Sequence, residues 1–224
     1  MVRVTYQCVP ASQGTRFTGS ALVRLLARLT DLDVPERGEV FADRLSHWLS
    51  WADAISLSSA LSSVQSGDAG HPPAAASDAQ ERERHRVRSS LAKAIADDSL
   101  SAADFASHRR ACFIRQQDME TSIGPLRAHL RAALTARSPT MARLAAVDAV
   151  MEQVLGARER SLLSAVPVLL ERRFEQLRQA HQSDEAEPDR WLDIFRKDMR
   201  GVLLAELDLR LQPCEGLLDA LRAS

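Results

Sequence analysis

The segment from Ser138 to Ala180 constrains the fold most, because its apolar residues recur every three or four positions with charged residues between them. This spacing places the apolar side chains along one side of an α-helix. Ser138 can cap that helix, and Pro139 suits its first turn, where no backbone donor is needed. The buried side is expected to consist of Leu144, Val147, Met151, Leu155, Leu162, Val166, Leu169, Leu170, Phe174 and Leu177.

The remainder of the chain favours the same kind of structure. Of its 224 residues, 45% are hydrophobic and 26% are charged, but only 4% are aromatic. Ala, Leu, Arg and Glu are abundant, whereas an alternating strand pattern appears only briefly, in Val2–Tyr6. These residues are strong helix formers and weak strand formers. We therefore expect an all-α protein, with an N-terminal helical hairpin and a C-terminal bundle of long, kinked amphipathic helices.

Changes in composition divide the chain into four parts. Residues 1–17 show no sustained periodicity and are expected to form a mobile arm. Residues 18–61 carry two amphipathic patterns that predict the helical hairpin, and residues 80–224 form the predicted bundle. Residues 62–79 are rich in Ser, Gly, Ala and Pro, and they offer too little apolar surface to offset the entropy of ordering. This stretch is predicted to be a flexible linker.

Prolines and caps predict where the helices of the bundle begin, bend and end. Ser101 is expected to start a helix, with Asp104 at the capping-box position. Pro125 predicts a kink or a break. At Pro167 a bend is preferred over a restart, because the apolar pattern continues in register across it. Pro213 is expected to end the last long helix and to leave at most a short terminal turn after it.

Charge and hydropathy exclude several classes of protein. The formal net charge is −1, so no global field attracts nucleic acid or an anionic membrane. No run of eighteen apolar residues could span a bilayer, and the N-terminus lacks the features of a signal peptide. The three cysteines, Cys8, Cys112 and Cys214, are far apart in sequence, which is typical of free thiols in a reducing cytosol. We expect a bacterial cytoplasmic protein without an integral membrane segment.

No residue pattern identifies a site of chemistry. His108 and Cys112 lie four residues apart on one helical face, and they admit two interpretations: two ligands of a shared ion, or core packing with a partly exposed histidine. Two ligands are too few for a metal site, and no third group supports a Cys-His catalytic pair. The glycines fit neither the phosphate-binding nor the dinucleotide-binding spacing. We assign no catalytic residue, no metal site and no cofactor.

An arginine-rich stretch supplies the strongest case for nucleic-acid binding. Arg82, Arg84, Arg86 and Arg88 occupy alternate positions, so they spread around a helix rather than forming one stripe. Neighbouring glutamates dilute their charge, and no aromatic residues lie between them for base stacking. A solvated, salt-bridged helix face is the favoured interpretation, and a nucleic-acid-associated regulator using residues 82–110 is the alternative.

A pair of tryptophans in the N-terminal hairpin suggests a binding surface. Trp48 and Trp51 lie three residues apart, with Leu45 and Ile55 nearby in the apolar pattern. They could anchor a partner, since tryptophan is enriched in binding hot spots, or they could pack the core of the hairpin. The leading hypothesis is a non-enzymatic cytoplasmic interaction protein. Its amphipathic helices would bury apolar sides against a protein partner or a second copy.

Several strings resemble a proteobacterial family catalogued as a domain of unknown function. The similarity covers nearly the whole chain apart from the arm and the linker. It is carried by Gly19–Asp31, Phe41–Leu57, Leu144–Glu152, Arg158 with Glu159, and Val166–Phe174. The family has no activity that assigns a role to any residue. The resemblance implies genes encoded near membrane proteins with proton-channel-like and outer-membrane-protein-like features, and hence a soluble accessory to an envelope-associated assembly.

Overall fold

The computed structural model describes residues 20–30, 50–62, 75–97, 104–181 and 190–223. All regular secondary structure in these ranges is helical, so the predicted all-α class is confirmed. The helices are α1 (Ala21–Thr30), α3 (Trp51–Ser62), α4 (Ala75–Ala96), α5 (Phe105–Thr135), α6 (Pro139–Leu163), α7 (Val166–Ala180) and α8 (Arg190–Ala223).

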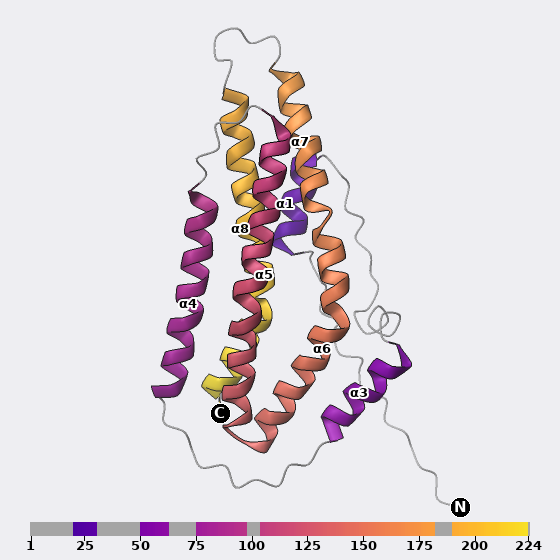
Figure 1. Cartoon of the computed structure of the whole chain (residues 1–224), viewed down its shortest axis with the longest axis vertical. Helices are drawn as coiled ribbons and strands as arrows, with labels where there is room; N and C mark the ends of the chain where they lie inside the picture. The colour runs from indigo at the N-terminus through magenta and orange to yellow at the C-terminus, as the bar shows by residue number, and fades with distance from the viewer. Residues whose placement is uncertain (1–19, 31–49, 63–74, 98–103, 182–189, 224) are drawn as a thin grey trace, which may run out of the picture.

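The long helices form an up-down-up-down bundle (Figure 1). Helix α5 lies between α4 and the α6–α7 column and also contacts α8, which in turn contacts α4 and α7. Helix α1 lies against α7 and α8, whereas α3 packs against α6 at the edge of the bundle. The described parts of the predicted hairpin therefore pack on different helices of the bundle. Much of that hairpin, residues 31–49, lies outside the described residues.

One continuous core joins the main helices. On α5 the predicted heptad positions Cys112, Met119 and Leu126 are buried, together with Ile123 and Leu130. Helix α8 contributes the longest buried series, which includes Phe195, Met199, Val202, Leu203, Leu207 and Leu211. Helices α1 and α4 add two buried apolar residues each. Burial of apolar area along both central helices is the main stabilising term for such a bundle.

The predicted buried side of residues 138–180 is correct in α7 and wrong in much of α6. Val166, Leu170, Phe174 and Leu177 are buried. In contrast, Leu144 is 39% exposed and Leu162 is 64% exposed. Along α6 only Ala145 and Leu163 are buried. Because α6 contacts α5 and α3, its partners do not cover a single stripe, and part of its apolar surface stays in water.

The chain restarts at Pro167, where a bend was predicted. Helix α6 ends at Leu163 and α7 begins at Val166, while Ser164 and Ala165 keep right-handed helical torsions between them. Proline has no N–H to donate to the carbonyl four residues earlier, which is that of Leu163. Gln116 Nε2 donates to this carbonyl instead, at 3.1 Å. The lost helical hydrogen bond is therefore replaced by one from α5.

Two further prolines lie inside continuous helices. Helix α5 runs unbroken across Pro125, so the predicted interruption does not become a break. The prediction that Pro213 ends the last helix is wrong, because α8 continues to Ala223. An interior proline costs about 3 kcal/mol. The residues beyond it bury Leu217, Leu218 and Leu221, and each burial stabilises by roughly 1.5–3 kcal/mol, which offsets that cost.

Local hydrogen bonds define the helix starts. Asp104 itself caps α5 by accepting from the Ser107 backbone N–H at 2.8 Å, so the predicted start at Ser101 is wrong. The predicted Ser138 cap is confirmed, since its hydroxyl accepts from Met141 N–H at 3.2 Å. Helix α4 begins at Ala75, within the stretch predicted to be a linker, and residues 63–74 of that stretch lie outside the described ones.

Candidate functional site

Helix α3 begins at a well-defined cap. The Asp53 backbone N–H donates to Ser50 Oγ at 3.2 Å, and the Ser50 N–H donates to Asp53 Oδ2 at 2.9 Å. This reciprocal pair is a capping box with Asp in the place of Glu. Hydrogen bonds from the side chain and the backbone of Ser50 lower the pKa of Asp53. The cap fixes Trp51 at the first helical position and so sets the direction of every later side chain.

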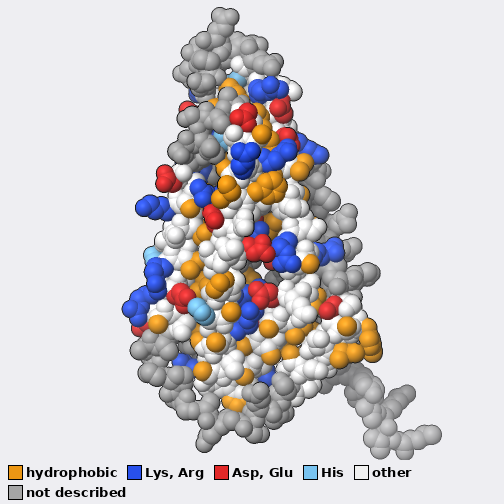
Figure 2. Space-filling view, in the orientation of Figure 1, with side chains coloured by type: hydrophobic (Ala, Val, Ile, Leu, Met, Phe, Trp, Pro, Cys, Tyr) orange, Lys and Arg blue, Asp and Glu red, His pale blue; other side chains and the backbone are white. Residues whose placement is uncertain are grey.

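One side of α3 faces the bundle and the other faces solvent. Asp53, Leu57 and Ala60 lie on one side of the helix and are its least exposed residues, so this side faces α6. On the opposite side, Trp51 is 82% exposed and Ile55 is 52% exposed. Figure 2 shows hydrophobic side chains gathered where α3 lies at the edge of the molecule. This apolar surface is the strongest candidate for a binding site.

Two of the four residues predicted to bind a partner belong to this surface. Trp51 and Ile55 lie one helical turn apart on the side of α3 that is directed away from α6, and Leu61, which is 59% exposed, lies on the flank of the same helix. The other two, Leu45 and Trp48, lie outside the described residues. The alternative interpretation, that Trp51 packs the core, is not what the structure shows for this side chain. Its role in partner binding stays a prediction.

The arginines of α4 are divided between two sides of that helix. Arg84 pairs with Glu215, and Arg88 Nη2 lies 2.9 Å from Asp208 Oδ1, so both hold α4 against α8. Arg82 and Arg86 are exposed, and Arg82 Nε donates to the Asp78 carbonyl at 3.1 Å. Ion pairs this exposed contribute about 0–1 kcal/mol each. The four cations do not form a continuous phosphate-binding stripe, which weakens the nucleic-acid alternative.

A buried polar cluster lies at the centre of the bundle. Glu206 on α8 is fully buried, and its carboxylate accepts from Gln116 Nε2 at 3.0 and 3.1 Å and from Arg210 Nε at 2.9 Å. Gln116 Nε2 also donates to the Leu163 carbonyl at the junction of α6 and α7. Because both carboxylate oxygens accept hydrogen bonds within the protein, the cluster is suited to fixing the positions of three helices. Sequence reasoning missed it, although the helical period places Glu206 on the buried side of α8.

A second polar network joins α5 and α6. Arg127 makes a bidentate contact with Asp148, with Nη2–Oδ1 and Nε–Oδ2 distances of 2.6 and 2.8 Å. Arg131 Nη1 lies 3.1 Å from Asp148 Oδ2 and also pairs with Glu152. Bidentate arginine–carboxylate pairs combine strength with defined geometry. This network fixes the register of α5 and α6 near their connecting turn.

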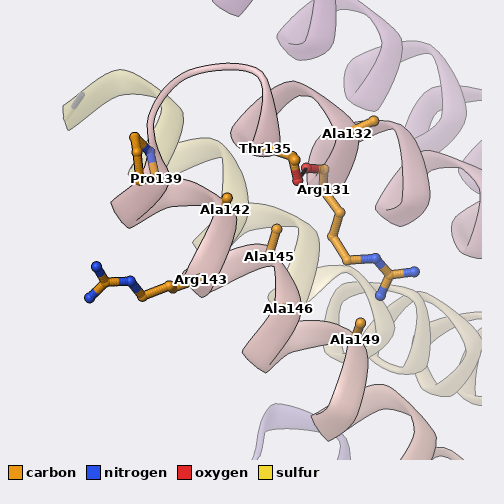
Figure 3. A pocket seen from close by; sticks show the side chains of 9 residues that line it. All are labelled: Arg131, Ala132, Thr135, Pro139, Ala142, Arg143, Ala145, Ala146 and Ala149. Atoms are coloured by element: carbon orange, nitrogen blue, oxygen red, sulfur yellow. Dashed lines mark hydrogen bonds between the residues drawn. The ribbon is translucent and has the colours of Figure 1, made fainter. Parts of the chain in front are cut away.

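An open pocket of about 360 Å³ lies beside this network (Figure 3). Its walls are largely alanine methyl groups from α5 and α6, with Thr135 and Pro139 among them. The side chains of Arg131 and Arg143 extend in different directions rather than converging on the pocket. Ligand sites usually combine apolar walls with a few convergent polar groups. The two arginines of the pocket wall are therefore not placed as the convergent polar groups of such a site.

His108 and Cys112 lie in the core, not at a surface site. The His108 ring packs against Phe195 and Phe174, with centroid distances of 5.1 and 6.0 Å. Burial, together with the charge of Glu206, raises the pKa of the Cys112 thiol to about 12. Burial raises the pKa of Cys214 to about 11. Over the described ranges no three His, Cys, Asp or Glu side chains are placed to hold a metal ion.

None of the described helices combines the length and apolar character needed to cross a bilayer.

Comparisons with known proteins extend over the whole sequence. No curated protein and no solved structure matches the sequence. Residues 9–223 match the model of a family described as protein of unknown function (DUF3348), which confirms the resemblance found in the sequence. Because that match spans nearly all residues of the chain, the chain belongs to the DUF3348 family.

Proposed function

We propose that this protein is a non-enzymatic helical adaptor that binds protein through the exposed side of α3. The observation that carries the proposal is the exposure of Trp51, at 82%, on the side of α3 directed away from α6. Ile55 extends the same surface by one turn. Single exposed apolar residues are ordinary, but a tryptophan and an isoleucine adjacent on one helix face are typical of a binding anchor.

The energy available from this surface is sufficient for binding. A tryptophan that is 82% exposed offers on the order of 200 Å² of area. At roughly 25 cal/mol per Å², burying that area stabilises a complex by about 5 kcal/mol before the costs of association are subtracted. Ile55 adds to this term. A helix laid against α3 would bury both side chains through contacts spaced three or four residues apart.

The arrangement of ionisable groups supports a role without chemistry. Glu206 and the carboxylates of the α5–α6 network are engaged by arginines or by Gln116. The two described cysteines are buried free thiols with raised pKa values, which makes them poor nucleophiles. The proposal places the protein in the bacterial cytoplasm, where such thiols stay reduced.

The proposal is tested by affinity capture of the full-length chain from its own cells, with Ile55→Asp compared with Ser56→Asp. Position 55 lies on the outer side of α3, whereas Ser56 is exposed on its flank, where its hydroxyl donates to the Ala52 carbonyl. We expect Ile55→Asp to lose the captured partner and Ser56→Asp to retain it, with both variants equally helical. Partners that bind both variants equally well would refute the proposed surface.

A further inference from the structure

Along the side of α3 that is directed away from α6, large side chains lie in the first turns and small ones in the last turns, while Leu61, which is 59% exposed, lies on the flank of the helix. Trp51 and Ile55 occupy its first turns, and Ser58 and Ser62 occupy its last turns. The spacing of four, three and four residues places all four along one side of the helix, and all four are exposed. These four residues are called the outer face of α3 below. Its serines provide shallow positions into which large side chains could pack.

The outer face is complementary to itself in one orientation. If two α3 helices lie antiparallel with Trp51 of one copy against Ser62 of the other, Ile55 falls against Ser58. A twofold axis then repeats both contacts, as in a closed dimer. Each large side chain meets a small one, which is how facing helix surfaces interdigitate without voids. A parallel pair would instead set tryptophan against tryptophan and serine against serine.

We infer that the outer face of α3 binds a second copy of this chain, with the two α3 helices antiparallel. The inference deepens the proposed function, on which it rests, because it names the partner of the same surface. Helix α3 lies at the edge of the bundle (Figure 1), and all four side chains of its outer face are exposed.

Charge favours a second copy over an unrelated amphipathic helix. The single charged residue of α3 is Asp53, which lies on the side toward α6 and bonds to Ser50. Two outer faces therefore meet without like-charge repulsion. An amphipathic partner helix normally carries flanking charges that select its partner, and the outer face offers no counter-charge to them. An uncharged surface is best matched by another uncharged surface.

The area of the contact predicts a weak dimer. Two tryptophans and two isoleucines, with the serines opposite them, bury on the order of 800 Å² in total. Stable complexes bury about 1,200–2,000 Å², whereas transient ones lie below that range. We therefore expect a dimer that dissociates on dilution, with a dissociation constant on the order of micromolar or weaker.

The self-association is tested by sedimentation velocity on the full-length chain, from roughly 1 μM to 1 mM. Wild type should shift from monomer to dimer across this range. Ser58→Asp places a charge against Ile55 of the second copy twice per dimer, and it should raise the dissociation constant at least tenfold. The matched control Ser56→Asp should change it less than about threefold. A wild-type chain that stays monomeric, or equal effects of the two substitutions, would overturn the inference.

Disulfide capture tests the orientation separately. In a background with Cys8→Ser, a tagged Ser58→Cys chain is mixed with an untagged Ile55→Cys chain and oxidised. The buried thiols of Cys112 and Cys214 should not compete. The antiparallel register predicts that the cross-linked product joins one tagged and one untagged chain. A product that is mainly tagged-to-tagged and untagged-to-untagged would contradict that register.

Different results would refute the adaptor proposal and the self-association through α3. A monomeric wild type, together with a cellular partner that is lost in Ile55→Asp, would refute the second copy and leave the adaptor proposal intact. A dimer that is weakened by Ser58→Asp supports the inference whether or not a different protein is also captured. Loss of neither contact in Ile55→Asp would refute both.

Discussion

Replacing Glu206 by Met should destabilise the bundle strongly. The carboxylate is fully buried, accepts from Arg210 at 2.9 Å and accepts from Gln116 at 3.0 and 3.1 Å. Met has a similar helix propensity and an unbranched side chain, so the change mainly removes the acceptor. Removing one member of a buried ion pair typically costs about 3–5 kcal/mol, because the other charge loses its partner. This is a large fraction of the roughly 5–15 kcal/mol that stabilises an ordinary domain.

The double variant Glu206→Met/Arg210→Met isolates the cause. Replacing both members of a buried pair by apolar residues is often neutral or stabilising. Gln116 donates a hydrogen bond to the Leu163 carbonyl, and we expect both variants to keep it. We therefore expect the double variant to recover at least about 2 kcal/mol relative to the single one. The assay is urea unfolding followed by circular dichroism, with the slope compared between variants. The reasoning is refuted if the single change costs less than about 1 kcal/mol, or if the double change costs as much as the single one.

Three further predictions concern thiols, pH and a proline. In a Cys8→Ser chain at pH 8, a thiol reagent should label Cys112 and Cys214 only on unfolding, because burial raises their pKa values to about 12 and about 11; rapid labelling of the native protein would contradict this. Hydrogen bonds from Ser107 lower the pKa of Asp104 in the folded state. The contribution of Asp104 to the free energy of unfolding is therefore present above about pH 3.9 and is lost as pH falls through the lowered pKa. Melting curves should therefore show wild type losing stability relative to Asp104→Asn below about pH 4, and parallel pH profiles would argue against it. Pro213→Ala should restore one helical hydrogen bond in α8 and raise the free energy of unfolding by roughly 1–3 kcal/mol. A free energy of unfolding below that of wild type would show that the fixed torsion of the proline ring stabilises the protein more than the restored hydrogen bond does.

The sequence predicted the parts of the fold that depend on local periodicity. The heptad of α5 and the apolar stripe of α7 both lie in the core, because both helices pack against α8. The same reasoning failed on α6, where Leu162 is exposed. Which side of a helix is covered depends on the placement of other helices, and periodicity does not encode that placement.

The prolines show a second limit of sequence reasoning. Pro167 and Pro213 have the same local effect, since each removes one backbone donor. The chain restarts at the first, where Gln116 from α5 supplies the missing donor. It continues through the second, where buried leucines on both sides keep the helix on the core. The outcome depends on distant contacts, which a single sequence does not reveal.

The candidate site was predicted in part. Trp51 and Ile55 were recognised from their spacing, and the structure places them together on one exposed side of α3. Their exposure could not be predicted, because the sequence pattern of an apolar helix side is the same whether that side packs on the bundle or faces solvent. The complementarity of Trp51 and Ile55 with Ser58 and Ser62 became apparent only once the side facing α6 was known.

The central claim is that this protein binds other protein molecules through the outer face of α3. Site-specific photo-crosslinking in the native cells tests this claim most directly. A photoreactive residue is placed at position 55 or 58, and at exposed control position 56 on the flank of the same helix. The account predicts strong cross-linked products from 55 and 58 and little from 56. Products of equal yield from all three positions, or products from position 56 alone, would contradict it.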